Sequence, residues 1–164
     1  MEDDFVSLYS EKDITLLKKR LGIWTAVCVI IGAAALAVCV SFAVSAYFTE
    51  TRELFIPTVL VSVFGGFSVI TVYRFVIEDI RAAIKHTEAM LKGESEIVAG
   101  SFTVTGEKLF IRKGVPIVRV KVAGNELVSS LQIYDKKAAL LDGSAERVAT
   151  VYGFVTAYGK HEDI

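Results

Sequence analysis

Residues that commonly bind metals or carry catalysis are scarce in this sequence. Among 164 residues there are two histidines and two cysteines. Cys28 and Cys39 lie about three helical turns apart on one apolar segment, so they share a helix face and are too distant to form a disulfide with each other. Neither His86 nor His161 has cysteine, histidine or carboxylate neighbours at ligand spacing. We therefore expect the cysteines to pack as small apolar residues and predict no metal site.

Signatures of an enzyme are missing as well. The glycines never form a phosphate-binding loop ahead of a helix, and Ser129-Ser130 lacks an assignable base. The formal net charge is −1, so no overall field favours nucleic acid or an acidic substrate. We expect a non-enzymatic protein with no cofactor, no nucleic-acid partner and no identifiable small-molecule substrate.

Charged residues are absent from two long apolar blocks, Gly22–Phe48 and Leu54–Tyr73. As helices they would extend about 40 Å and about 30 Å, enough to cross the core of a bilayer. The blocks predict a transmembrane hairpin over residues 21–77, with spans 22–48 and 54–77 and an external loop 49–53. The expected localisation is the cell membrane, as a multi-pass protein whose partner is the lipid bilayer.

Basic residues near the ends of the predicted spans indicate the orientation of the hairpin. The loop carries Arg52 against Glu50 and Glu53, whereas the basic residues near the other ends of the two apolar blocks are Lys12, Lys18, Lys19, Arg20, Arg74, Arg81 and Lys85. Because cytoplasmic flanks are enriched in lysine and arginine, both termini are expected in the cytoplasm.

Small residues are predicted to mediate helix packing, since apolar helices in lipid associate by close contact rather than by the hydrophobic effect. The candidates in the first span are Cys28, Gly32, Ala35 and Cys39; those in the second are Thr58, Ser62, Gly65 and Gly66. These two stripes are expected to face each other or a second copy of the chain.

Two helical segments flank the predicted hairpin. Residues 1–20 resemble an amphipathic arm in which Ser10 and Asp13 form a capping box at the start of a helix. Residues 78–93 form a helical connector that ends at Gly93 and carries a heptad-like seam: Ile77, Ile80, Ile84, Thr87 and Leu91. This seam could pack on the chain's own domain or N-terminal helix, or form an intermolecular coiled coil.

The remaining chain predicts a small β-domain over residues 94–160 with a tail at 161–164. The expected fold class is membrane α plus soluble β, the soluble part being an antiparallel β-barrel or sandwich of OB-like or SH3-like form. Its expected strands are Glu96–Val104, Leu109–Arg112, Ile117–Val122, Leu127–Tyr134, Ala138–Leu141 and Val148–Tyr158. The expected turns include Thr105-Gly106-Glu107. Residues 144–149, at the start of the last expected strand, could form a short helix instead of strand.

Two surfaces of this domain are candidate binding sites. A basic cluster that could contact an anionic surface consists of Lys108, Arg112, Lys113, Arg119 and Lys121. The equal numbers of acidic and basic residues from Glu94 onward favour the alternative, a solvated sheet face balanced by nearby carboxylates. The last predicted strand places Tyr152, Phe154 and Tyr158 on one side, which suits either a buried central strand or an aromatic ligand-binding face.

The layout of a membrane hairpin followed by a small β-domain resembles that of NfeD-type proteins. This resemblance implies an OB-fold and a stomatin-like membrane partner, and it carries over no individual residue. A bacterial pleckstrin-like domain after two spans has a similar layout, but its usual C-terminal helix is missing here. The leading functional hypothesis is a membrane-anchored interaction or scaffold module that binds another membrane protein or itself as a homo-oligomer. The alternative is an oligomeric channel or transporter subunit.

Overall fold

The computed structural model describes residues 5–49, 52–112, 114–124, 128, 130–141 and 145–159, with backbone alone at residues 52 and 106–112. The chain forms two compact units. We call the first the β-domain; it combines Met1–Leu16 with Ala82–Ile164. We call the second the helical hairpin; it consists of Leu17–Arg81. The β-domain is thus built from both ends of the chain, and the hairpin is inserted between them.

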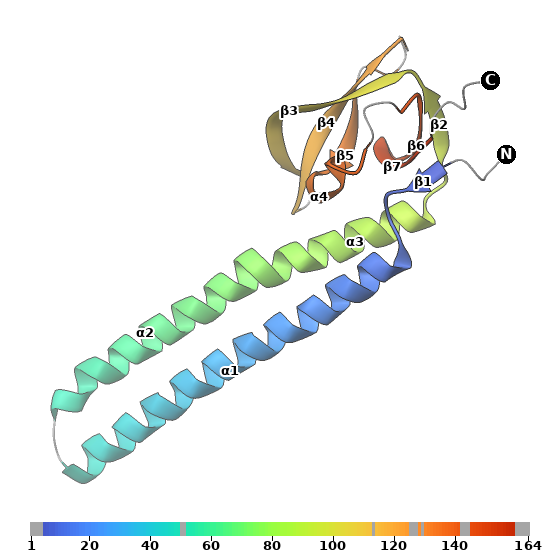
Figure 1. Ribbon diagram of the computed structural model, residues 1–164. Coiled ribbons are helices and arrows are strands. Elements are labelled where there is room, and N and C mark those ends of the chain that lie inside the picture. The colour runs from blue at the N-terminus through green and yellow to red at the C-terminus, as the bar shows by residue number, and fades with distance from the viewer. Residues whose placement is uncertain are drawn as a thin grey trace. The chain divides into compact units, whose positions relative to one another are not determined.

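The helical hairpin is formed by two long apolar helices that run side by side (Figure 1). The first is α1 (Glu11–Thr49), which begins in the β-domain. A 3₁₀ turn (Arg52–Leu54) leads to α2 (Phe55–Val72). Pro57 lies in the first turn of α2, where its missing amide hydrogen removes no helical bond. Both helices are long and apolar enough to cross a membrane.

The second helix continues beyond its apolar part, as the sequence predicts. It passes through a π-helical turn (Tyr73–Ile77) into α3 (Glu78–Lys92). Gly93 ends the helix, and its amide donates to the Ala89 carbonyl at 3.1 Å. A π-turn adds a residue to one helical turn and therefore shifts the face that later residues present.

The part of α3 that belongs to the β-domain packs on that domain. Its buried residues are Ala83, Ile84, Thr87 and Met90. Two of them, Ile84 and Thr87, belong to the predicted seam, but Leu91 is 39% exposed and Met90 is buried in its place. Of the two predicted roles for this seam, packing on the chain's own domain is the one that the structure supports.

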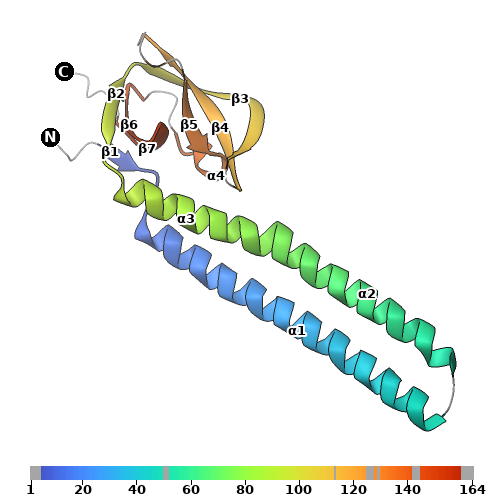
Figure 2. The same ribbon diagram turned by 180° about the vertical axis from the view of Figure 1, so that it is seen from behind.

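In the part of the β-domain that the structure describes, seven strands form one sheet. Figure 2 shows these strands from behind. They are β1 (Phe5–Ser7), β2 (Glu96–Ala99), β3 (Ser101–Arg112), β4 (Val115–Ala123), β5 (Ser130–Tyr134), β6 (Arg147–Val151) and β7 (Phe154–Gly159). The order is β2-β6-β7-β5-β4-β3, with β1 paired to β7. A short helix, α4 (Asp135–Ala138), follows β5.

The sheet differs from the predicted antiparallel barrel in two respects. The pair β5–β7 is parallel, with Gln132 opposite Phe154, while the other pairs are antiparallel. The hydrogen-bonded order is also open, with β2 and β3 as its ends. Alternation along a strand indicates which face is buried but carries no information about which strands become neighbours.

The two end strands of the sheet are nevertheless consecutive in the chain, because only Gly100 separates β2 from β3. Its φ of +150° suits glycine, and a Cβ there would lie 2.6 Å from the Ala123 carbonyl oxygen. The Gly100 amide donates to the Glu146 carbonyl at 2.9 Å. A sheet whose opposite ends meet at one residue must be strongly curled.

Several local predictions are wrong. The turn expected at Thr105-Gly106-Glu107 lies inside β3, where the register with β4 shifts between Thr105 and Phe110. Ala138–Leu141 is not a strand, because α4 and a turn occupy this segment. The strand expected over Val148–Tyr158 is a hairpin whose turn is Tyr152-Gly153, both with positive φ. Short apolar runs of this kind do not distinguish strand, turn and helix by pattern alone.

The interior of the β-domain is filled by branched aliphatic side chains of β4, β5, β6 and β7. Ile117, Val120, Ile133, Val148 and Val155 have no exposed surface. From Val118 to Lys121 of β4 burial alternates, with Val118 and Val120 buried and Arg119 and Lys121 exposed.

The N-terminal arm is not simply a helix. The capping box is confirmed: the Ser10 amide donates to Asp13 Oδ2 at 2.9 Å, and the Asp13 amide donates to Ser10 Oγ at 3.3 Å. Upstream of it, β1 pairs with β7, and the Leu8 amide donates to the Thr156 carbonyl at 2.8 Å. Only three residues form this strand, which is too short to show a periodic signal.

Replacing Gly93 by alanine is expected to destabilise the β-domain by about 1–3 kcal/mol. A Cβ at this position would lie 2.1 Å from Val151 Cγ1, and Val151 is buried. Denaturant unfolding of the purified chain, followed by hydrogen exchange in β6, measures the loss. Lys92→Ala, at the exposed neighbouring position, should leave stability nearly unchanged. The double variant Gly93→Ala/Val151→Ala provides the check. If it loses as much unfolding free energy as the two single variants added together, the new methyl group does not clash with Val151 as the geometry requires.

Candidate functional site

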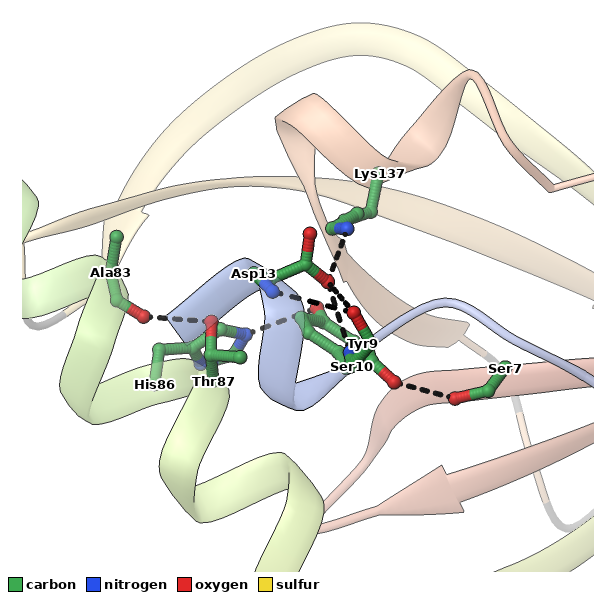
Figure 3. A network of polar contacts seen from close by, with 8 residues as sticks. All are labelled: Ser7, Tyr9, Ser10, Asp13, Ala83, His86, Thr87 and Lys137. Atoms are coloured by element: carbon green, nitrogen blue, oxygen red, sulfur yellow. Dashed lines mark hydrogen bonds and ion pairs between the residues drawn. The ribbon is translucent and has the colours of Figure 1, made fainter. Parts of the chain in front are cut away.

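A cluster of polar and aromatic contacts ties the N-terminal arm to α3 and α4 (Figure 3). Tyr9 is 2% exposed, and its Oη lies 3.2 Å from His86 Nε2 on α3. The arm is also held by a hydrogen bond from Ser7 Oγ to the Tyr9 carbonyl at 2.7 Å. The Tyr9–His86 contact joins residues 77 positions apart in the sequence, whereas the Ser7 bond lies within the arm.

An ion pair lies beside this hydrogen bond. Lys137 Nζ on α4 is 2.9 Å from Asp13 Oδ2 and 5.8 Å from the centre of the Tyr9 ring. Burial would raise the pKa of Asp13, but hydrogen bonds from Lys137 and Ser10 outweigh it and hold the pKa below its ordinary value. Asp13 therefore stays ionised at neutral pH, where it both caps α1 and pairs with Lys137.

His86 is surrounded mainly by aromatic rings. Its ring centre lies 4.8 Å from that of Phe154, 5.7 Å from Tyr9 and 5.9 Å from Tyr134. Burial lowers the pKa of His86, and burial likewise raises the pKa of Tyr9. Both side chains are thus uncharged at neutral pH. The contacts of His86 are those of a ring packed among other rings, with a hydrogen-bonding partner at Tyr9.

A cavity of about 440 Å³ opens beside this cluster. Residues of α3, β4 and the β6–β7 hairpin line it: Ala82, Lys85, His86, Ala89, Met90, Val115, Tyr152 and Phe154. Its volume falls within the range of about 300–1,000 Å³ that is usual for ligand pockets. A mostly apolar wall with a few polar groups is also typical of such pockets.

Tyr152 has an unusual conformation at the edge of this cavity. Its φ is +53°, and its side chain is 77% exposed. Two-residue turns with positive φ normally use asparagine, aspartate or glycine at this position. A tyrosine at this position strains the backbone and exposes a large ring. Strained residues of this kind cluster at functional sites, which makes Tyr152 a candidate site residue.

The aromatic face predicted on the last strand is partly assembled. Tyr152 and Phe154 both line the cavity, although the turn at Tyr152-Gly153 separates them. Tyr158 lies further along β7, opposite Val6 of β1 and Val148 of β6. Sequence reasoning missed Tyr9, His86 and Lys85 as neighbours of this face, since their proximity depends on how the N-terminal arm and α3 pack.

Within the helical hairpin, several of the predicted packing residues meet. A Cβ on Gly65 would lie 2.5 Å from Ala35 Cβ, and one on Gly32 would lie 3.8 Å from Val69 Cγ2. Cys39 Sγ is 3.1 Å from Ser62 Oγ and 3.8 Å from the Thr58 carbonyl oxygen. Cys28 Sγ lies 3.6 Å from the Val69 carbonyl oxygen. Gly66 has nothing within 4 Å of a Cβ, so this glycine does not lie at the same contact.

The predicted basic cluster is described only in part. Arg119 and Lys121 are exposed on β4, opposite Thr105 and Thr103 of β3. Lys113 and the side chains of Lys108 and Arg112 lie outside the described residues, so the cluster as an anionic-surface contact stays a prediction. His161 and Ser129 also lie outside that range. Within it, no group of three or more His, Cys, Asp and Glu side chains could hold a metal ion.

Comparisons with known proteins identify no relative of this chain. No protein-family model matches it, and neither a curated protein nor a solved structure is significantly similar to it.

The β-domain is expected to lose stability as pH falls below about 6.5, the ordinary pKa of histidine. Because the folded-state pKa of His86 is depressed, the folded protein favours the neutral ring. The stabilisation is fully present above the unfolded-state pKa and is lost as pH falls toward and through the folded-state value. This loss of stability can be measured by thermal unfolding at a series of pH values between about 8 and 5.

His86→Gln should remove this pH dependence, whereas His161→Gln should retain it. Asp13 titrates in a separate, more acidic window, because its folded-state pKa lies below 3.8. A pH profile that is unchanged in His86→Gln would show that another group causes the loss.

Proposed function

We propose that this chain is an integral membrane protein in which the helical hairpin crosses the bilayer and the β-domain acts as a non-enzymatic interaction module. The observation that carries the proposal is the exposed apolar surface of the hairpin. Its two main helices present large apolar side chains along their length, among them Val29, Ile30, Leu36, Val44, Phe48, Phe55, Ile56, Leu60, Val63, Phe64, Phe67 and Ile70. Soluble monomers rarely expose continuous apolar surface of this extent, whereas lipid accommodates it.

The composition of the β-domain supports a topology with both ends on one side. The domain unites Met1–Leu16 with Ala82–Ile164, so the chain enters and leaves the hairpin from the same compact unit. A membrane-spanning hairpin must then return to the side from which it started. The positive-inside rule favours the cytoplasm as that side and places the 49–53 loop outside.

Hydroxyl groups in the hairpin weigh against a channel. They donate to carbonyls four residues earlier on the same helix: Thr25 to Leu21, Ser41 to Ala37, Thr49 to Ser45, Thr58 to Leu54, Ser62 to Thr58, and Ser68 to Phe64. Because each of these hydroxyl hydrogens is donated within its own helix, the groups can face lipid without an unsatisfied donor. An anchor therefore agrees better with these contacts than a polar pore.

The β-domain supports binding more than chemistry. Its most distinctive feature is a cavity with aromatic and aliphatic walls, and His86, which lines that cavity, packs against three aromatic rings. We infer that the domain recognises another membrane protein or a second copy of the chain.

Cysteine accessibility in intact cells tests the membrane part of the proposal. In a variant with Cys28 and Cys39 replaced by alanine, single cysteines at Thr51 and at Ser101 should be labelled from opposite sides. Labelling of both from the same side would contradict the topology. Crosslinking of native membranes with mass spectrometry tests the interaction part. It should recover a second protein or a dimer attached to the β-domain, and a chain recovered alone would argue against a scaffold role.

A further inference from the structure

We propose that the cavity beside His86 binds a small amphipathic anion, a carboxylate with an aliphatic tail. This inference goes beyond the interaction module and does not depend on membrane insertion, because every described residue of the cavity belongs to the β-domain.

The shape of the site comes from one face of α3. Ala82, Lys85, His86, Ala89 and Met90 recur at helical steps of three and four, so they point toward one side. The two alanines leave space along the helix, and across from them lie Val115 of β4 and Phe154 of β7. The thioether of Met90 is flexible enough to adapt to a chain-like ligand. These walls favour an unbranched aliphatic body.

The charge of the expected ligand follows from Lys85. Lys85 is exposed, and it is the only charged side chain among the described residues that line the cavity. No lining carboxylate opposes it in this part of the chain. The imidazole of His86 and the hydroxyl of Tyr152 add neutral polar groups. One cation with two neutral hydrogen-bonding groups over an apolar wall complements a carboxylate head group.

Tyr152 provides the second, independent observation. The turn holds this residue at a φ of +53°, and its ring remains 77% exposed. The ring approaches the end of α3, because a Cβ on Gly93 would lie 3.3 Å from Tyr152 Cε2. A strained residue that displays an aromatic ring over a cavity is accounted for if the ring covers a ligand.

His86 links the site to the N-terminal arm. The same ring that lines the cavity lies within hydrogen-bond distance of Tyr9. A ligand that packs against His86 should therefore also slow hydrogen exchange in β1, which the arm contributes to the sheet.

Photocrosslinking tests this assignment. The full chain, in nanodiscs of zwitterionic lipid, is exposed to a dodecanoate that carries a diazirine in its tail, and labelled peptides are mapped by mass spectrometry. The label should concentrate in residues 82–90 and 152–154. Unlabelled dodecanoate should compete, whereas dodecanol and dodecyltrimethylammonium should compete at least about five-fold less well.

Two variants and one control make the test specific. Ala89→Phe fills the cavity from an exposed position and should reduce labelling at least about ten-fold. Lys85→Gln should weaken competition by dodecanoate about three- to five-fold. Lys92→Gln, an exposed lysine on the same helix outside the cavity, should change neither. Hydrogen exchange in β4 and β5 verifies that each variant is folded.

Three outcomes would overturn the proposal. They are labelling confined to the hairpin, labelling that persists in a folded Ala89→Phe variant, and equal competition by the three dodecyl compounds. These measurements remain interpretable if the proposed membrane topology is wrong. Every described residue of the cavity belongs to the β-domain, so the labelled positions do not depend on how the hairpin inserts.

Discussion

Replacing Tyr9 by alanine is expected to destabilise the β-domain by about 3–5 kcal/mol, the range for truncation of a buried aromatic side chain. Tyr9 is 2% exposed and lies between His86 of α3 and Lys137 of α4. Its removal would leave a void at the point where the N-terminal arm meets the rest of the domain. Hydrogen exchange of the full chain should show faster exchange in β1, β7 and the C-terminal part of α3.

Two other substitutions separate the causes of this loss. Tyr9→Phe keeps the ring and removes only the hydroxyl beside His86, so it should cost about 1 kcal/mol. Val6→Ala changes a residue of the same arm that is 54% exposed and should have a small effect. Equal losses in all three variants would mean that the arm is not held through the Tyr9 ring.

Replacing Gly65 by leucine is expected to separate α1 from α2 where Gly65 faces Ala35. A Cβ at Gly65 would lie 2.5 Å from Ala35 Cβ, so a larger side chain cannot be accommodated without moving one helix. The change can be followed through Ser62→Cys in a Cys28→Ala background. Because Cys39 Sγ lies 3.1 Å from Ser62 Oγ, oxidation should join positions 39 and 62. Gly65→Leu should reduce the yield of this disulfide at least about five-fold.

The neighbouring glycine provides the matched control. A Cβ at Gly66 would have nothing within 4 Å, so Gly66→Leu should leave the disulfide yield unchanged. Ala35→Gly should partly restore the yield in a Gly65→Ala variant by giving the new methyl group room. Equal effects at Gly65 and Gly66 would show that the stripe acts through a second copy of the chain instead.

Features that depend on a few adjacent residues could be predicted from sequence. The Ser10–Asp13 capping box, the helix that continues beyond Tyr73 and its end at Gly93 are of this kind. They follow from local hydrogen-bonding geometry and helical periodicity, which the sequence displays directly. The strand order could not be read in the same way, because the pairing of β1 with β7 joins positions about 150 residues apart.

The candidate site was predicted only in outline. The sequence places Tyr152 and Phe154 on one side of a continuous strand, whereas a turn brings both to the cavity. Lys85 stands in the sequence only as one of the basic residues beside the apolar blocks, and His86 has no metal-binding neighbours at ligand spacing. His86 is half-buried among three aromatic rings that come from distant parts of the chain. No periodic pattern marks contacts of that range.

The discontinuous β-domain has a consequence for biosynthesis. β1 is the first strand to leave the ribosome, and its partner β7 is the last. At about 5–20 residues per second, roughly 10–30 s separate the two. During that interval Leu8 and Tyr9, which end fully covered, have no sheet to pack on. The domain can close only after the hairpin has been made. If the hairpin crosses a membrane as proposed, both of its ends must also lie in the same compartment, so completion of the sheet would report correct insertion. A chain inserted in the wrong topology would leave β1 and β7 unpaired with each other and open to quality-control proteases.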